Sequence, residues 1–117
     1  MSNTNEIKQL TKEFKDCQKS LSAIGDETRQ HIIISLLECD CKGVRVGELT
    51  KKTNLSRPAV SHHLQILKEA GIIDMRREGT KNYYYFDSRK TELSKLMKLL
   101  HHVNEIIEKA PANPGYL

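Results

Sequence analysis

The sequence predicts one mainly helical domain with a single small β-hairpin. Three observations support this fold class. Apolar residues recur at spacings of three and four near both ends of the chain, which is typical of helices with one buried face. A proline-started helical segment lies at the centre, and a run of strand-forming aromatic residues follows it. With 117 residues, the chain has the usual size of one domain with one hydrophobic core.

Composition narrows the class of protein. No apolar run approaches the roughly eighteen residues of a membrane span, so we expect a cytoplasmic protein without a membrane partner. The cysteines Cys17, Cys39 and Cys41 are odd in number, and we expect them to be reduced thiols. A nucleophile paired with a base, a phosphate-binding loop and a complete metal set are all missing, so we do not expect an enzyme.

The N-terminal third predicts two helices. The first has one apolar stripe, formed by Ile7, Leu10, Phe14, Cys17, Leu21 and Ile24, and it ends at Gly25. Asp26 is a suitable N-cap for the second helix, and Glu27 lies in its first turn. The residues of the second helix that we expect to face inward are Ile32, Ile33, Leu36 and Leu37.

The centre of the chain predicts a pair of short helices. Residues 44–46 are long enough for a short strand, and Gly47–Thr53 then indicates a brief helix that ends at a left-handed Asn54. In the next helix, Ser56 can cap the N-terminus, Pro58 is tolerated in the first turn, and Gly71 stops the C-terminus. Two short helices joined by a tight turn form a helix-turn-helix.

Strand-forming residues follow Gly71. Two strands around Gly79 and Thr80 form a hairpin, and its basic tip makes it the wing of a winged helix-turn-helix. The final helix, about residues 91–109, has its apolar stripe at Leu93, Leu96, Met97, Leu100, Val103 and Ile107. Residues 110–117, with two prolines, form a tail without helical potential.

The terminal helices predict a homodimer. Each carries a continuous apolar stripe, and the domain between them is too small to cover both, although each helix could instead fold back on its own domain. We therefore divide the chain into an N-terminal dimerisation helix (1–24), a winged helix-turn-helix DNA-binding core (25–87), a C-terminal dimerisation helix (88–109) and a flexible tail (110–117). A two-fold dimer predicts an inverted-repeat operator in double-stranded DNA.

The central helix is the candidate DNA-reading element. Successive residues of a helix turn by about 100°, so Val60, Leu64 and Leu67 share an inward face while polar residues occupy another. Residues 44–86 contain eight Lys or Arg residues against four acids, and the remainder is balanced, which is typical of a surface that faces phosphate. The candidate DNA contacts are Ser56, Arg57, Ser61, His62, Gln65, Lys68, Arg76, Arg77 and Lys81.

Two other interpretations remain open. The exposed face of the central helix could dock a protein partner in place of DNA, in which case binding would depend less on salt. The histidine pairs, His62 with His63 and His101 with His102, could suggest a metal site, but adjacent residues point about 100° apart. We expect groove contact for His62, partial burial for His63, and surface roles for the other pair.

Three segments of the sequence resemble the ArsR/SmtB-type bacterial repressors, which have a winged-helix fold. They are Ile24–Arg29 with the apolar residues of Ile33–Leu37, Pro58–Leu64, and Glu69–Ile73. The resemblance spans roughly Leu21 to Phe86. It implies a dimer built from the first and last helices, operator binding in the absence of an inducer, and repression by blocking polymerase.

The metal sites of that family are missing here. The zinc-type site falls on Ser88, Lys90, His101 and Asn104, and the arsenic, cadmium and lead type falls on Arg45–Leu49, which has no cysteine. The pair Cys39 and Cys41, with Cys17, could bind a soft metal or arsenite or could undergo thiol oxidation. The alternative is that Cys17 is an ordinary buried residue and the other two are loop residues without function. We therefore expect an autoregulatory repressor whose inducer is undefined, with thiol sensing as one hypothesis.

Overall fold

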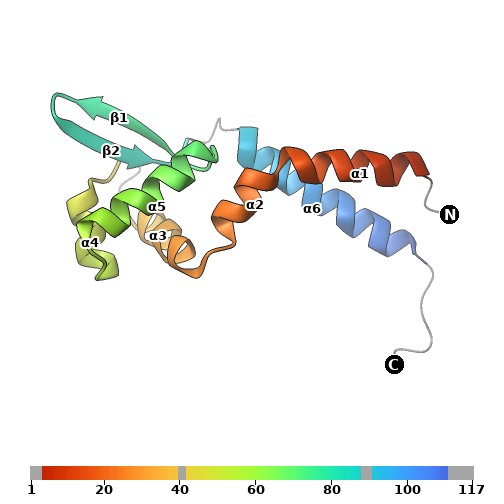
Figure 1. Ribbon diagram of the computed structural model, residues 1–117, viewed down its shortest axis with the longest axis horizontal. Coiled ribbons are helices and arrows are strands. Elements are labelled where there is room, and N and C mark those ends of the chain that lie inside the picture. The colour runs from red at the N-terminus through yellow and green to blue at the C-terminus, as the bar shows by residue number, and fades with distance from the viewer. Residues whose placement is uncertain (1–3, 40–41, 88–90, 111–117) are drawn as a thin grey trace.

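The computed structural model describes residues 4–39, 42–87 and 91–110. It confirms a mainly helical chain with one two-stranded antiparallel hairpin (Figure 1). The elements, in chain order, are α1 (Thr4–Asp16), α2 (Gln18–Ile24), α3 (Glu27–Leu37), α4 (Val46–Thr53), α5 (Arg57–Glu69), β1 (Asp74–Glu78), β2 (Lys81–Tyr85) and α6 (Thr91–Lys109). Within the described ranges, no helix is long and apolar enough to cross a membrane.

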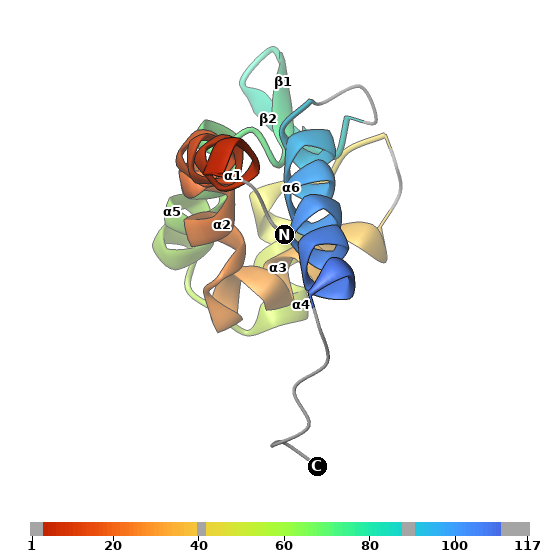
Figure 2. The same cartoon turned by 90° about the vertical axis from the view of Figure 1, so that its right-hand side faces the viewer.

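The molecule is elongated, with extents of 57 × 30 × 22 Å. Helices α1 and α6 lie side by side and project away from the rest of the chain as a two-helix arm (Figures 1 and 2). The opposite end holds α3, α4, α5 and the hairpin. Helix α2 joins the two parts, because it packs against α3 and α5 on one side and against α6 on the other.

The first helix differs from the sequence-based expectation. The single helix expected over residues 1–24 is two helices that meet at Cys17, whose φ of −99° and ψ of 6° leave the helical region. The Cys17 side chain is only 3% exposed and packs with Leu96 and Leu99 of α6. The break lets α2 turn toward the core, where Ala23 is buried. Tertiary packing at Cys17 therefore overrides a continuous helical pattern.

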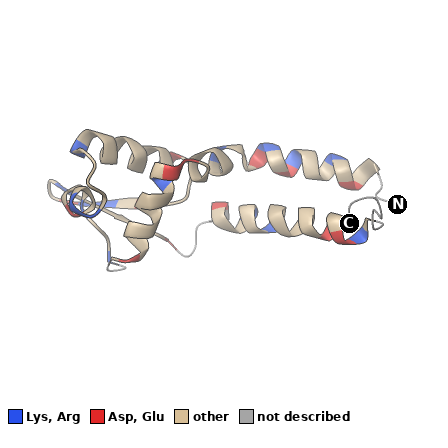
Figure 3. Cartoon of the chain, turned by 90° about the horizontal axis from the view of Figure 1, so that it is seen from below, with Lys and Arg blue, Asp and Glu red and all other residues tan. Residues whose placement is uncertain are grey.

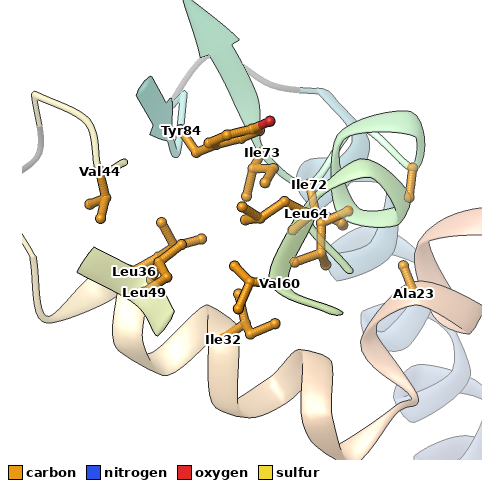
Figure 4. Packing of buried hydrophobic residues seen from close by; sticks show 12 residues of the cluster. Ala23, Ile32, Leu36, Val44, Leu49, Val60, Leu64, Ile72, Ile73 and Tyr84 are labelled. Atoms are coloured by element: carbon orange, nitrogen blue, oxygen red, sulfur yellow. The ribbon is translucent and has the colours of Figure 1, made fainter. Parts of the chain in front are cut away.

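The main hydrophobic core lies between α3, α4, α5 and the hairpin (Figure 4). Ile32 and Leu36 of α3 are buried as expected, and Ile33 is half-buried. Leu37, which we expected to face inward, is 66% exposed. The buried members of the core are Ala23, Ile32, Leu36, Val44, Leu49, Val60, Leu64, Leu67, Ala70, Ile72, Ile73 and Tyr84.

A second, smaller cluster holds the arm together. Leu96 and Leu99 of α6 pack with Cys17, and the half-buried Leu10, Leu21, Ile24 and Val103 surround them. The stripe predicted on the last helix therefore divides between two surfaces. Leu96 faces inward, whereas Met97, Leu100 and Ile107 are exposed, and the fully buried Leu99 was missed by the stripe.

The hairpin is attached to the core by one short bridge. Met75 pairs with Tyr84 in the antiparallel register, and Tyr84 also exchanges backbone hydrogen bonds of 2.8 and 2.9 Å with Val44. The short strand expected over residues 44–46 is this single bridge at Val44, because Val46 already begins α4. The bridge fixes the hairpin beside the segment that enters the helix-turn-helix.

Candidate nucleic-acid interface

The turn between α4 and α5 forms as the sequence predicts. Asn54 ends α4 in the left-handed conformation with a φ of 61°. Ser56 then caps α5, since its side-chain oxygen accepts a hydrogen bond of 3.3 Å from the Ala59 N–H. Pro58 lies in the first turn, where its missing N–H has no partner to lose. These local signals place α5 at a fixed angle to α4, which is helix-turn-helix geometry.

The apolar face of α5 decides which residues reach the surface. Val60, Leu64 and Leu67 are fully buried in the main core. Because side chains on a helix turn by about 100° per residue, Ser61, His62 and Gln65 are forced outward, and all three are exposed. The structure therefore confirms the predicted placement of this polar flank, and Ser56 and Arg57 are exposed at the same helix end.

The surroundings of Gln65, Lys68 and Arg57 differ along α5. The Gln65 amide donates a hydrogen bond of 3.0 Å to the Glu69 carboxylate, one turn further along α5. Its carbonyl oxygen can still accept a hydrogen bond, and a base edge offers such a donor. Lys68 is half-buried. A Cβ at Gly47 would lie 3.6 Å from the Arg57 guanidinium, which places Arg57 next to α4.

The three basic residues of the wing that are candidate DNA contacts have two kinds of environment. Arg76 is held by contacts within the protein, because it donates to the Lys42 carbonyl, pairs with Glu78 at 3.1 Å and lies 4.8 Å from the centre of the Tyr83 ring. Arg77 and Lys81 are exposed near the tip. Arg77 donates to the Gly79 carbonyl at 3.0 Å, which holds it close to the turn. The contacts of Arg76 indicate an anchor for the wing, a role that its charge alone did not suggest.

Charge along the arm is balanced. Lysines and acidic residues are interspersed along α1 (Figure 3), and α1 carries three residues of each sign. The positive excess of the chain therefore lies in the helix-turn-helix and hairpin, as the sequence indicates. A positive excess confined to one end of a molecule favours contact with a polyanion at that end.

The histidines have distinct environments. His62 is exposed, and His63 is half-buried as predicted, with Nδ1 3.3 Å from an Arg29 nitrogen. His102 does not have the expected surface role, because it lies between α1 and α6 with Nδ1 2.8 Å from Glu13 and Nε2 3.5 Å from Glu6. Among the described residues, no three His, Cys, Asp or Glu side chains are arranged to hold a metal ion.

The cysteines are not gathered at one place. The Cys39 thiol is half-buried and donates a hydrogen bond of 3.1 Å to the Ser35 carbonyl. Cys17 belongs to the separate cluster of the arm, and burial, with the nearby Asp16 carboxylate, raises the pKa of its thiol. Cys41 lies outside the described residues. The structure thus separates Cys17 from Cys39, against the grouping that the sequence left open.

Sequence reasoning missed Arg29 as a functional residue. Its guanidinium donates to the Ala23 carbonyl at 2.7 Å and to the Ser22 carbonyl at 3.3 Å, which satisfies the open C-terminal end of α2. Asp26 caps α3 as predicted, accepting 2.9 Å from the Arg29 N–H, and this bond lowers the pKa of the Asp26 carboxyl. The one available signal was an arginine near the start of an apolar helix, where a charge needs partners.

The fold and the site together define a class of protein. A helix-turn-helix with an outward polar flank on its second helix, followed by a basic hairpin, is a winged helix-turn-helix DNA-binding regulator. Residues 26–75 match the family model described as "Bacterial regulatory protein, arsR family". An HTH-type transcriptional regulator of Methanocaldococcus jannaschii is 42% identical over 89 residues, covering 72% of this chain and 93% of the relative. The chain therefore belongs to the arsR family of bacterial regulatory proteins.

The regulator HlyU supports the same family, and a second solved structure supports the fold. The transcriptional activator HlyU of Vibrio cholerae is 34% identical over 83 residues, covering 71% of this chain and 72% of HlyU. The solved structure of reduced HlyU has a TM-score of 0.61 at 30% identity and covers 81% of this chain and 95% of that one. A homodimeric winged helix-turn-helix DNA-binding domain from Mycobacterium bovis has a TM-score of 0.56 at 18% identity, over 96% and 98% of the two chains, and shows the fold alone.

The contacts of Arg76 predict that it stabilises the wing. Replacing Arg76 with Met removes the Lys42 and Glu78 contacts but keeps an apolar stem over Tyr83. We expect the backbone amides of Val44 and Tyr84 to exchange with solvent about tenfold faster, because the bridge between them loses support. Hydrogen exchange measured by NMR tests this. Arg77→Met, at the exposed neighbouring position, is the matched control, and equal exchange in the two variants would contradict the anchoring role.

Proposed function

We propose that this arsR-family regulator is an autoregulatory repressor that binds an inverted-repeat operator as a homodimer and is released by an inducer. The observation that supports it most is the exposed flank of Ser61, His62 and Gln65, held outward by the buried face of the same helix. Short polar side chains on an exposed helix allow close approach to base edges in the major groove. The protein would meet its DNA in the cytoplasm, and occupying DNA requires no catalytic step.

Each part of the interface has a separate role in this proposal. Ser61, His62 and Gln65 read base edges, and Arg57 reaches a phosphate or a guanine from the N-terminal end of α5. Ser56 and Lys68 lie at the two ends of the same helix and contact the DNA backbone. Arg77 and Lys81 of the wing bind phosphate, and Arg76 adds positive charge near them while it anchors the hairpin. Phosphate contacts position the protein, and base contacts select the sequence.

The arm supports the homodimer. Ile7 and Phe14 of α1 and Met97, Leu100 and Ile107 of α6 are between 42% and 71% exposed. Large apolar side chains on two adjacent helices are costly to leave in water, and a second copy of the same arm would cover them. A two-fold dimer would place the two α5 helices one DNA turn apart, about 34–36 Å. The Mycobacterium bovis domain of the same fold is itself described as homodimeric.

The DNA-reading flank generates the first functional prediction. Replacing both Ser61 and Gln65 with Ala should remove the preference for operator over shuffled DNA, because it deletes direct base contacts worth roughly 1–3 kcal/mol each. Arg77→Ala should instead weaken binding to both DNAs and lower the salt slope by about one. The measurement is fluorescence anisotropy with the DNA upstream of the protein's own gene.

A reporter fused to the same upstream DNA distinguishes repression from activation, since deletion of the regulator should raise transcription from a repressed promoter. Unchanged operator preference in the Ser61 and Gln65 double variant would show that another surface reads the DNA. If a partner binds the exposed face of α5 and the affinity does not depend on salt, the partner is a protein and not DNA.

The exposed flank of the arm generates a second prediction. Leu100→Glu should convert the dimer to a monomer, because it places a charge in the apolar flank of α6. Ser94→Glu adds the same charge at an exposed position of the same helix, on a different face, and should leave the dimer intact. Sedimentation velocity gives the mass of the wild type and of each variant. A monomeric wild type, or a dimeric Leu100→Glu variant, would contradict dimerisation through the arm.

Cys39 is the candidate residue for the response to an inducer. Cys39 lies against the core beside the hairpin, in a shallow hollow of about 140 Å³ that is also lined by Val44, Tyr84 and Phe86. Oxidation of Cys39, or capture by a soft metal or arsenite, would disturb the residues that attach the wing. Cys41, two residues further along the chain, supplies the second thiol.

Thiol sensing predicts a loss of response in a variant without these two thiols. In the Cys39→Ser, Cys41→Ser double variant, operator binding should no longer weaken on addition of oxidant or arsenite. Cys17→Ser is the matched control and should respond as the wild type, because Cys17 is buried in the arm. Operator binding by each protein, with and without each reagent, gives the answer. A double variant that still responds would exclude this pair as the sensor.

A further inference from the structure

One guanidinium connects three helices near the DNA-reading face. Arg29 belongs to α3, and its side chain is only 13% exposed. Its Nε and Nη2 atoms donate to the Ala23 and Ser22 carbonyls at the end of α2. Its remaining nitrogen, Nη1, lies 3.3 Å from Nδ1 of His63 in α5. Arg29 therefore ties α2 and α3 to the helix that carries the polar flank.

The chemistry of the pair fixes the protonation state of His63. A guanidinium stays charged at all physiological pH and can only donate hydrogen bonds. The Nδ1 atom must therefore accept, which it does only when the imidazole is neutral with its proton on Nε2. A protonated His63 would lose its acceptor and place a second positive charge beside Arg29.

The groups around His63 have opposing effects on its pKa. The charged and titratable groups that face it are Arg29 and Asp26, from the start of α3, and His62 on its own helix. Burial and the Arg29 charge favour the neutral ring, and they outweigh the Asp26 carboxylate, so the pKa of His63 is lowered from 6.5. Asp26 is already engaged as the N-cap of α3, with its carboxylate 4.0 Å from Arg29.

We propose that Arg29 and His63 form a latch that holds the recognition helix α5 against the α2–α3 turn, and that protonation of His63 opens it. The Arg29–His63 contact attaches α5 to α2, and α2 packs in turn on α6 of the arm. The latch therefore fixes α5 relative to the part of the chain that sets the dimer. Opening it lets α5 shift without unfolding, so that the flank of Ser61 and Gln65 no longer meets base edges in register.

The sign of the pH effect follows from the lowered pKa of His63. Above pH 6.5 the ring is neutral in both folded and unfolded chains, and the closed latch contributes its full stability. As the pH falls through the lower folded pKa, the ring gains a proton and that contribution is lost. DNA affinity through a correctly placed α5 should fall over the same interval. This part of the inference rests on the proposed DNA-binding function.

His62 would produce the opposite trend. Its ring is exposed on the DNA-reading flank, so protonation adds a positive charge where phosphate or an acceptor on a base lies. The wild-type pH profile is therefore a sum of two opposing effects. Replacing His62 with Asn removes the effect of His62 and leaves His63 as the histidine that acts on α5. His63→Asn supplies a neutral oxygen near the place of Nδ1, so the latch stays closed at every pH.

The test compares His62→Asn with the His62→Asn, His63→Asn double variant from about pH 8 to about pH 5.5. With a fluorescein-labelled duplex of the DNA upstream of the protein's own gene, the single variant should lose roughly tenfold in affinity toward low pH, because a displaced α5 loses about one base contact. The double variant should bind equally well near pH 8 and stay flat. Equal pH dependence in the two variants would overturn the latch.

A second readout needs no DNA. NMR of the histidine ring protons should show the pKa of His63 below the ordinary imidazole value of 6.5 in the wild type, and Arg29→Gln should raise it. Amides of α5 in the His62→Asn variant should exchange faster at low pH, and those of the double variant should not. If no variant binds the DNA at any pH, the proposed function fails, while ring titration and amide exchange still decide the latch. A His63 whose pKa is not lowered, or does not respond to Arg29→Gln, would overturn it.

Discussion

The burial of one face of α5 is the constraint on which the rest of the molecule depends. Val60, Leu64 and Leu67 have no exposed surface, and burying each contributes about 1.5–3 kcal/mol. Rotating α5 enough to hide its polar flank would bring these side chains into water, so the core fixes both the orientation and the depth of the helix. The same core receives Tyr84 of the wing and Ile32 of α3. DNA recognition thus depends on a packing arrangement that itself contains no DNA-contacting residue.

Features determined by neighbouring residues were predictable from the sequence. The caps at Asp26 and Ser56 and the left-handed Asn54 depend on atoms within four residues, and each forms as expected. Features that depend on distant parts of the chain could not be predicted from the sequence. The break at Cys17 arises from α6, which is about eighty residues away in sequence. Arg76 was chosen as a candidate DNA contact by its charge, and its hydrogen bond to the Lys42 carbonyl was not foreseen, because such a contact leaves no periodicity in the sequence.

Helix α6 shows why a single apolar stripe was an incomplete description of the terminal helices. Apolar side chains cover more than one side of this helix, and only the side that carries Leu96 and Leu99 is covered by α1 and α2. Met97 and Leu100 lie next to this side of the helix and stay exposed. The alternatives left open by the sequence, folding back on the same domain or pairing with a second copy, are therefore compatible. One face of α6 packs on its own chain, and the exposed apolar residues next to it would pack against a second copy.

The two kinds of signal considered for this protein would act on different parts of the interface. Cys39 lies beside the bridge between Val44 and Tyr84, so chemistry at the thiol acts on the wing and on its phosphate contacts. The contact between Arg29 and His63 acts on α5 itself, and so on the side chains that distinguish one base from another. A regulator built in this way can lose overall affinity through one route and sequence selectivity through the other. Because the wing and α5 share one hydrophobic core, either change also weakens the packing that supports the other.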